Sequence, residues 1–237
     1  MGMLSSTLTS VLAAPILSQM MAPEAKAALL VKLTNQLKVL QAELALLQAA
    51  EAKTHITPLP VVEADYTRGP ANARIKIVTF TDFDCPFCKL FHETLHTIGS
   101  KYPDVSVSYR HFPLEQIHPN SKKLSIAAEC AGTIGGDVAF WKFVDSAFDS
   151  RGVNETTNML QVNTFASAAG VPLSAFESCR TSKSAEASVA ADMKDGTTAG
   201  VMGTPQSFVF KDGIKVATLS GSQPLAVVEE IIKNLQN

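Results

Sequence analysis

The stretch TFTDFDCPFCKLFHE, residues 79–93, sets two cysteines between two hydrophobic patterns of different period. The apolar residues before the pair form a short β-rich run: Ile75, Ile77, Val78 and Phe80. Those after it recur at helical spacing: Leu90, Phe91, Leu95 and Ile98. Cys85 and Cys88 are therefore predicted to lie where a buried strand ends and a helix begins. A chain with this junction is expected to build strands and helices into one core, as α/β proteins do.

The spacing of Cys85 and Cys88 fits two kinds of chemistry, because zinc sites and redox-active dithiols both use C-x-x-C. A thiolate at a helix N-terminus meets unpaired backbone N–H groups and the positive end of the helix dipole. Pro86 suits the first turn of a helix, where its missing N–H costs nothing. The sequence offers no second ligand pair at similar spacing. The pattern therefore favours a redox dithiol over a soft-metal site.

Composition excludes some partners. The 237 residues carry a net charge of −2, with acidic and basic residues interspersed, so we expect no nucleic-acid partner. The segment from Leu4 to Ala22 is uncharged, but it contains Pro15 and no basic residue precedes it. It is compatible with the remnant of an export signal, and the opening Met1-Gly2-Met3 has the character of an added start.

Two further cysteines, Cys130 and Cys179, lie in the helix-like segments SIAAECAG and SAFESCRT. One interpretation is that both are separate buried thiols that act as small hydrophobic residues. The alternative is a bridge, which suits an even cysteine count and an oxidising compartment. Such a bridge would close a loop of about 50 residues and contribute on the order of 4 kcal/mol in the chain-entropy model. The sequence favours the bridge.

Residues 24–53 form a separate unit with a leucine pattern. Steps of three and four define a heptad seam: Leu30, Leu33, Leu37, Leu40, Leu44 and Leu47. Other apolar residues widen this surface: Leu29, Val31, Val39 and Leu46. The helix could pack on its own domain, but the width of the apolar surface favours self-association. A Pro- and Gly-containing linker follows, THITPLPVVEADYTRGPANA.

The remainder of the chain adds strands on either side of a helical region. A second strand is predicted at Val105–Phe112, a helical region at about 119–198, and a hairpin of Ser207–Phe210 and Lys215–Leu219 turning at Asp212-Gly213. A closing helix is predicted to start near Ser222, with Pro224 in its first turn. This order predicts four segments: a helical unit at 1–55, a first half-domain at 56–113, a helical insertion at 114–198, and a second half-domain at 199–237.

The stretch GTPQSF places Pro205 before a strand that should pair beside the cysteine end of the sheet, where a cis X-Pro bond suits a tight turn. With this feature the resemblance to a known family becomes specific. From about Tyr66 onward the chain resembles the DsbA-type thiol–disulfide oxidoreductases, in the branch with a helical insertion and an extra cysteine pair. The motifs that carry it are RGPANARIKIVTFTDFDCPFCKLF, YRHFPLEQIHPNSKKLSIAAECAG, FWKFVDSAF, FESCRTS and GVMGTPQSFVF.

The resemblance implies an α/β fold: a thioredoxin-like mixed sheet with an inserted helical domain, here preceded by an N-terminal amphipathic helix. It implies that an exposed Cys85 is the nucleophile and Cys88 the resolving thiol. Client proteins would dock on the residues beside them: Pro86, Phe87, Thr204 and Pro205. It also implies a structural disulfide between Cys130 and Cys179, and neither a cofactor nor a metal. The implied partners are exported proteins with thiols or disulfides and a membrane quinone-linked redox protein, and the implied location is periplasmic or extracytoplasmic.

Two positions depart from the family pattern. Phe87 stands where the best-studied oxidases carry histidine, so it supplies no charge or hydrogen bond to a Cys85 thiolate. Thr79 stands six residues before the nucleophile, where thioredoxin-like proteins often have a buried acid. Asp82 and Asp84 are nearer to the dithiol, but strand alternation predicts that they point to the surface.

On the predicted helix, His92 and Glu93 lie about one turn past Cys88, and both are expected to be exposed.

Three functions remain open at this point. The first is an extracytoplasmic oxidase that introduces disulfides. The second is an oligomeric isomerase or reductase, which the N-terminal helix favours and to which Thr204 before the proline is suited. The third is a soft-metal-binding protein that uses Cys85 and Cys88 as ligands.

Overall fold

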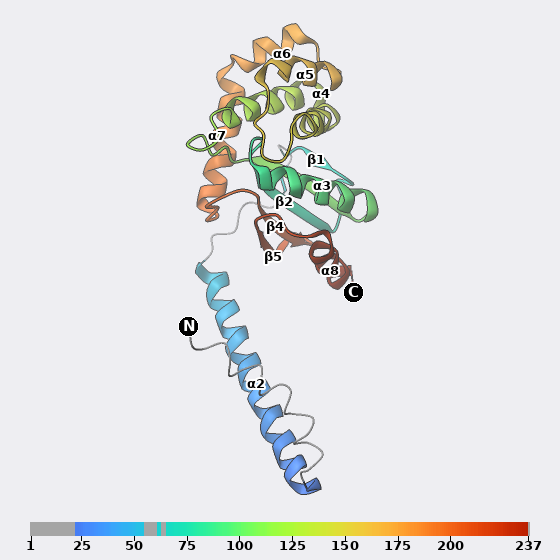
Figure 1. Ribbon diagram of the computed structural model, residues 1–237, viewed down its shortest axis with the longest axis vertical. Helices are drawn as coiled ribbons and strands as arrows, with labels where there is room; N and C mark the ends of the chain where they lie inside the picture. Colours follow the sequence, from blue (N-terminus) through green and yellow to red (C-terminus); the bar gives the residue numbers. More distant parts are fainter. Residues whose placement is uncertain (1–21, 55–60, 63–64, 237) are drawn as a thin grey trace. The chain divides into compact units, whose positions relative to one another are not determined.

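The computed structural model describes residues 22–54, 61–62 and 65–236 (Figure 1). The chain divides into two compact units, residues 1–55 and 56–237. The export-signal segment predicted at Leu4–Ala22 lies outside the described residues except for Ala22, and so does most of the predicted linker before Asp65.

The first unit contains the helix α2, Pro23–Thr54. Ala, Leu, Lys, Gln and Glu dominate its sequence, and all are good helix formers. Glu24 lies in the first turn, where a negative charge complements the helix dipole. Large aliphatic side chains of this helix are 41–62% exposed: Leu29, Leu30, Val31, Leu33, Leu37, Val39 and Leu40. The side chains of Leu44, Leu46 and Leu47 are not described.

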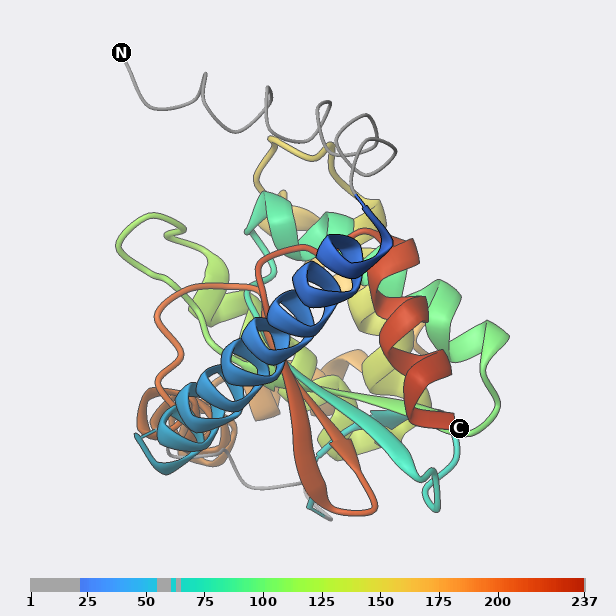
Figure 2. The ribbon, with the colours of Figure 1, turned by 90° about the horizontal axis from the view of Figure 1, so that it is seen from below.

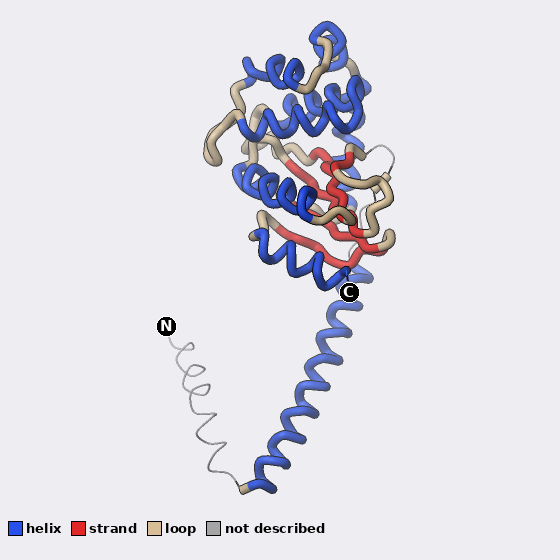
Figure 3. Tube along the Cα trace, turned by 90° about the vertical axis from the view of Figure 1, so that its right-hand side faces the viewer, coloured by secondary structure: helices blue, strands red, loops and turns tan. Residues whose placement is uncertain are grey.

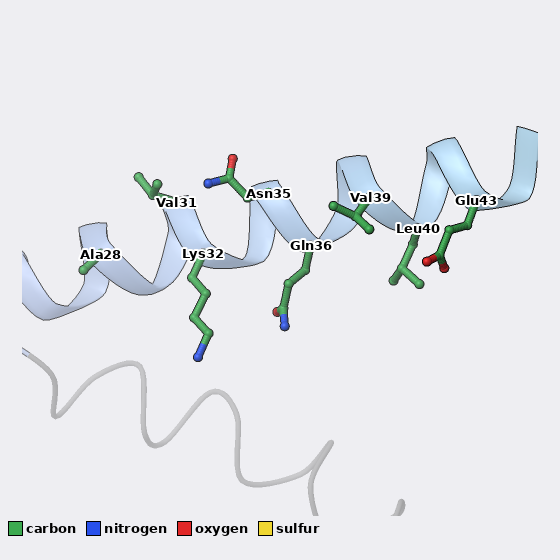
Figure 4. A pocket seen from close by; sticks show the side chains of 8 residues that line it. All are labelled: Ala28, Val31, Lys32, Asn35, Gln36, Val39, Leu40 and Glu43. Carbon is green, nitrogen blue, oxygen red and sulfur yellow. The ribbon is translucent and has the colours of Figure 1, made fainter.

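A surface hollow runs along α2, and its described lining comes from this helix alone (Figure 4). Apolar Val31, Val39 and Leu40 alternate there with polar and charged Lys32, Gln36 and Glu43. The expected N-terminal helix is thus present, but its apolar side chains are not confined to one narrow seam.

The second unit is built on one mixed sheet, whose strands are red in Figure 3. The strand order is β1-β3-β2-β4-β5. The strands are β1 (Thr67–Arg68), β2 (Ile75–Thr81), β3 (Val105–His111), β4 (Gln206–Lys211) and β5 (Ile214–Ser220). β2 and β3 are parallel, whereas the other neighbours are antiparallel. The predicted mixed sheet is confirmed, and β1 is an addition inside the predicted linker. Its two residues are too few to show a strand pattern in the sequence.

The helices of this unit are α3 (Pro86–Lys101), α4 (Ser121–Asp149), α5 (Val162–Ala168), α6 (Leu173–Arg180), α7 (Lys183–Thr198) and α8 (Leu225–Gln236). A short 3-10 turn, Met159–Gln161, precedes α5. The helical insertion is therefore a set of separate helices, and α4 itself is kinked at Gly136, whose φ is 66°. The predicted start of the last helix near Ser222 is wrong, because the Pro224 carbonyl is the first to accept helical amides, from Val227 and Val228.

Both faces of β2 are buried, which explains its nearly continuous apolar sequence. Ile75 and Ile77 belong to a core that includes residues of α3 and α8, and these two helices lie on one side of the sheet (Figure 2). Val78 and Phe80 face the opposite core, with Phe112, Val201, Phe208 and Phe210. A Cβ atom on Gly196 of α7 would come within 2.8 Å of Phe80 and Phe112, so glycine permits α7 to pack closely on this face.

Cys130 of α4 and Cys179 of α6 form a disulfide with an S–S distance of 2.01 Å and a Cα–Cα distance of 5.7 Å. Beside it, aromatic rings of the insertion pack against one another, with Phe143 contacting both Phe165 and Phe176. The bridge thus joins two helices whose buried faces are already apolar. Among the described residues, no helix combines the length and hydropathy that a bilayer crossing requires.

Candidate active site

The two remaining cysteines lie at the junction between β2 and α3, where the sequence places them. β2 ends at Thr81 and α3 begins at Pro86, so a short turn separates strand from helix. Cys85 is the N-cap residue, with extended backbone angles of φ −70° and ψ 126°, and Pro86 occupies the first turn. Cys85 and Cys88 are both unbridged thiols in this structure.

The loop before β4 supplies the other side of the site. β4 runs antiparallel to β2, with Phe80 opposite Gln206, so the start of β4 lies beside the end of β2. The Thr204–Pro205 peptide bond is cis. The Thr204 carbonyl oxygen lies 3.3 Å from the Cys85 sulfur and accepts a hydrogen bond from the protonated thiol. The structure therefore brings together Cys85, Cys88 and the Thr204–Pro205 loop.

The two thiols have opposite electrostatic environments. A hydrogen bond from the Cys88 thiol is the main cause that lowers the pKa of Cys85 to about 6, against the effect of burial. Hydrogen bonds from the backbone amides of Phe87 and Cys88 at the helix start lower it further. Burial raises the pKa of Cys88 well above its usual range, and the neighbouring Cys85 charge raises it further. At neutral pH, Cys85 is the thiolate and Cys88 the protonated thiol.

Access to the dithiol differs from the expectation. Cys85 is only 3% exposed, so the exposed nucleophile predicted from the sequence is wrong. The cause is a tertiary contact, because the distant Thr204–Pro205 loop packs against the sulfur. Phe87, between the cysteines, is 59% exposed, and Leu90 and Met202 are exposed as well. Cys85 is thus largely covered, whereas Phe87 beside it in the sequence is exposed.

Asp82 is buried, contrary to the prediction from strand alternation. The alternation ends with β2 at Thr81, and Asp82 begins a turn that folds its side chain inward. Its Oδ1 atom accepts a hydrogen bond from the Asp84 amide at 2.8 Å, and its Oδ2 atom accepts one from the Leu114 amide at 2.7 Å. The Nδ1 atom of His118 lies 2.9 Å from Oδ2. Backbone donors of the turn and of the loop after β3 thus compensate the carboxylate for the loss of water.

Asp84 is also buried rather than at the surface, and its Oδ1 atom accepts the Thr157 amide at 2.8 Å. The buried Arg151 guanidinium lies near this turn and donates to the carbonyl oxygens of Phe83, at 2.7 Å, and Cys85, at 3.0 Å. Arg151 thereby fixes the backbone before α3 and adds a positive charge near the thiols. Sequence reasoning missed it, because a single arginine after a helix carries no distinctive pattern.

His92 is buried, so its predicted exposure is wrong, whereas Glu93 is exposed as expected. His92 lies four residues after Cys88 and therefore shares its buried face of α3. Its ring bonds Tyr109 at 2.9 Å and Asp145 at 3.0 Å.

Thr79 stands at the position where thioredoxin-like proteins often have a buried acid. It is buried, and its hydroxyl shares a hydrogen bond of 2.9 Å with the hydroxyl of Ser207. Within the described ranges, no three or more His, Cys, Asp or Glu side chains are grouped as a metal site would require.

The chain is similar to known proteins in sequence and in fold. Residues 62–233 match a family model described as thioredoxin. The chain is 27% identical over 147 residues to the Na⁺/H⁺ antiporter NhaA 1 of Salinispora arenicola. That alignment covers 62% of this chain and 22% of the antiporter, so the chain spans well under a third of this relative's length.

Solved structures share the fold. Pseudomonas aeruginosa DsbA2 superimposes with a TM-score of 0.62 at 24% identity and covers 74% of this chain and 97% of its own. Proteus mirabilis ScsC, in a transitional conformation, gives a TM-score of 0.60 at 18% identity, covering 90% of this chain and 95% of its own. The expected DsbA-type architecture, with its helical insertion, is thereby confirmed. Since the family match spans most of the sequence and includes both cysteines and the cis-proline, this chain belongs to the thioredoxin family.

Proposed function

We propose that this protein is a thiol–disulfide oxidoreductase that forms disulfides in exported client proteins through its C-P-F-C dithiol. The observation that carries the proposal is the pair of oppositely shifted thiols at the start of α3. Cys85 has a lowered pKa and Cys88 a raised one, and both lie beside a cis-proline loop. This arrangement provides one stable thiolate and one protonated partner within one helical turn.

In the oxidising direction, a client thiolate attacks the Cys85 sulfur of a Cys85–Cys88 disulfide. The bond between the two enzyme sulfurs breaks, and Cys88 leaves and takes up a proton. A second client thiolate then attacks the mixed disulfide, and Cys85 leaves as the thiolate. The client loses two electrons and the enzyme gains them. Because the low pKa of Cys85 makes it a good leaving group and stabilises the reduced enzyme, it favours client oxidation.

Client docking is assigned to the surface around Cys85. Pro86, Phe87, Thr204 and Pro205 border the sulfur in sequence or space. The exposed aromatic ring of Phe87 suits the apolar side chains of an unfolded segment. Phe87 supplies packing area to a client rather than a hydrogen bond to the thiolate.

Location and reoxidation follow from the same chemistry. The Cys130–Cys179 disulfide supports an oxidising, extracytoplasmic or periplasmic compartment. An oxidase must pass two electrons onward after each cycle, for which we propose a membrane quinone-linked redox partner.

A second candidate is an oligomeric isomerase or reductase, and α2 favours it. Aliphatic side chains such as Leu33, Leu37 and Leu40 are more than half exposed on this helix. The structural likeness to ScsC covers 90% of the chain. Residues 62–237 alone make up a smaller share of the chain than this, so the likeness extends into the N-terminal helical unit. Self-association through residues 24–53 would gather several Cys85 sites around one misfolded client.

Refolding assays separate the candidates. The full-length chain is incubated with a reduced client, with a scrambled client, or with neither, and the redox potential of the Cys85–Cys88 couple is measured alongside. Formation of native disulfides from the reduced client, with an oxidising potential, supports the oxidase. Rescue of the scrambled client with little oxidation supports the isomerase, and absence of both activities overturns the oxidoreductase proposal.

A further inference from the structure

Arg151 is a buried arginine whose side chain reaches the dithiol turn. It lies one residue past Ser150, the C-cap of α4, and is 5% exposed. Its guanidinium contacts the backbone of Cys85, which is 66 positions earlier in the sequence. Within the described part of the chain, no carboxylate forms an ion pair or a hydrogen bond with it.

The acceptors of the guanidinium are backbone carbonyl oxygens. Nε and Nη2 donate to the Phe83 carbonyl at 3.1 and 2.7 Å, and Nη2 also donates to the Cys85 carbonyl at 3.0 Å. Nη1 donates within its own segment, to the carbonyl oxygens of Glu155 at 2.9 Å and of Gly152 and Val153 at 3.3 Å. A carbonyl oxygen satisfies an N–H group but carries no net charge, so these bonds leave the positive charge without a counter-ion.

The anions that act on this buried cation belong to the dithiol turn. Burial lowers the pKa of Arg151, and the charges of Asp84 and then of Cys85 oppose that shift. An arginine stays protonated at physiological pH, so the guanidinium remains a cation. Asp84 keeps its carboxyl group in both redox states, whereas the Cys85 thiolate exists only in the reduced protein.

Oxidation therefore removes one of the anions near the buried guanidinium. Neither sulfur is charged in a Cys85–Cys88 disulfide, so the cation loses an attraction that it has in the reduced protein. We propose that Arg151 is a positioning residue that supplies positive charge to the Cys85 thiolate from the segment after α4 and thereby keeps the dithiol couple oxidising. Phe87, at the position that carries histidine in the best-studied oxidases, supplies no charge. The inference rests on the proposed oxidoreductase function, with Cys85 as nucleophile.

Exchange with glutathione defines the equilibrium that Arg151 should shift. Two glutathione thiols are oxidised to one glutathione disulfide, and their two electrons break the Cys85–Cys88 bond. One of their protons goes to Cys88 and the other to solvent, so that Cys85 is left as the thiolate. A positive charge beside Cys85 favours this reduced product, which makes the protein disulfide a stronger oxidant.

Other charged or titratable groups lie around the dithiol turn. They are Asp82 and Asp84 in the turn, Cys88 in α3, Tyr109 in β3, His118 in the loop after β3 and Glu155 in the segment of Arg151. The Thr204–Pro205 loop contributes a neutral carbonyl. Substitutions at position 151 retain all of these groups, so a difference between such variants reports the charge at that position.

The redox equilibrium of the full-length protein with glutathione, measured at two pH values, tests the proposal. Arg151→Met removes the charge, and we expect it to raise the pKa of Cys85 by about 1 unit, as read from thiolate absorbance at 240 nm. At pH 8 the equilibrium constant for reduction by glutathione should fall about tenfold, which corresponds to about 30 mV. At pH 5, where Cys85 is mostly protonated in both proteins, the two constants should be nearly equal.

Two controls separate charge from support of the backbone. Arg151→Lys keeps a positive charge but loses the planar donor group, and it should raise the pKa of Cys85 by less than half as much as Arg151→Met. Glu155→Ala removes the exposed carboxylate that accepts the Gly152 amide at 2.8 Å, so it loosens the segment of Arg151 without removing positive charge. It should not raise the pKa of Cys85.

Thermal unfolding verifies that each variant is folded. If Arg151→Met does not fold, Arg151→Gln decides, since its neutral amide can still donate to a carbonyl oxygen. Equal Cys85 pKa values in the neutral variant and the unsubstituted protein overturn the proposal. A change in the equilibrium constant that is the same at pH 5 and pH 8, or that Arg151→Lys or Glu155→Ala reproduces, overturns it as well.

Failure of this inference can be distinguished from failure of the proposed function. The absorbance titration requires no exchange activity, so it tests the effect of Arg151 on the Cys85 thiolate by itself. If the unsubstituted protein does not exchange with glutathione, the oxidoreductase function is contradicted, whatever the titration of the Arg151 variants gives.

Discussion

The protein contains two cysteine pairs that differ in almost every physical respect. Cys85 and Cys88 begin a helix, with backbone donors, a buried carboxylate and the Arg151 cation around them. Cys130 and Cys179 join α4 to α6 beside packed aromatic rings. The first pair is unbridged, and the pKa of Cys85 is lowered while that of Cys88 is raised. The second pair is a closed disulfide. Position, rather than residue type, thus separates a reactive dithiol from a structural link.

The largest effect should come from the reactive pair itself. We expect Cys85→Ser to abolish thiol–disulfide exchange and Cys88→Ser to accumulate clients as mixed disulfides, because the trapped bond lacks its resolving thiol. Non-reducing gels and intact mass spectrometry of the trapped species measure both. The double variant Cys130→Ala/Cys179→Ala is the control and should retain exchange. Exchange activity in Cys85→Ser, with no trapped client in Cys88→Ser, would contradict the assigned roles.

The structural pair should respond in stability instead. Removing the bridge with Cys130→Ala/Cys179→Ala should lower the free energy of unfolding by about 4 kcal/mol, since the disulfide closes a long loop in the unfolded chain. Urea denaturation measures the loss, and peptide mapping without reductant checks the bridge in the parent protein. Exchange kinetics measured on the folded variant should be unchanged. Freely alkylatable thiols at both positions in the parent protein would refute the bridge.

The reactive pair should also make the reduced protein sensitive to pH. Absorbance at 240 nm should show the Cys85 thiolate half-formed at about pH 6. The pKa of Cys85 is lower in the folded state than in the unfolded chain, where the pKa of a cysteine thiol is about 8.5. The stability contributed by Cys85 is therefore fully present above pH ~8.5 and is lost as the pH falls through about 6.

Urea denaturation of the reduced protein and of Cys85→Ser across this window should reveal the difference. The bridged pair does not titrate and contributes nothing to this pH dependence. An unshifted Cys85 thiol would argue against an oxidase.

A smaller shift should follow from Phe87→His. A protonated imidazole between the cysteines would stabilise the Cys85 thiolate, and we expect the pKa of Cys85 to fall by about 1 unit. The couple should become more oxidising in parallel, because the reduced form gains stability. Phe87→Leu keeps an apolar side chain and is the control. A rise in the Cys85 pKa with histidine would contradict this explanation.

The smallest effect on either pair should come from removing residues 1–54. The truncated chain retains the unit 56–237, so the bridge, the dithiol pKa and single-turnover exchange should be unaffected. If the aliphatic surface of α2 drives association, light scattering should detect an oligomer for the full chain and a monomer for the truncation. Isomerisation of a scrambled client should weaken in the monomer. A monomeric full-length chain would instead contradict association through α2.

The sequence alone determined much of this arrangement, because the relevant signals are local. The β-rich run before Cys85 and the helical spacing after Cys88 predict the strand–helix junction, and both elements occur there. Turn residues Asp212-Gly213 predict the hairpin, where Asp212 and Gly213 adopt positive φ angles between β4 and β5. The leucine-rich segment predicts a helix, and α2 spans it. Each of these signals depends on neighbours a few residues apart.

Only the tertiary structure decided which polar groups surround the dithiol. Asp82 turns inward because donors arrive from the loop after β3, and His92 is buried because Tyr109 and Asp145 satisfy its ring. The Thr204 carbonyl covers Cys85 from a segment 119 positions away. Burial of a charged or polar side chain is affordable only when distant chain segments supply hydrogen-bond partners. Local periodicity does not depend on those distant partners. It therefore predicted the strand, the helix and the position of the cysteines between them, but not the burial of the carboxylate and the imidazole.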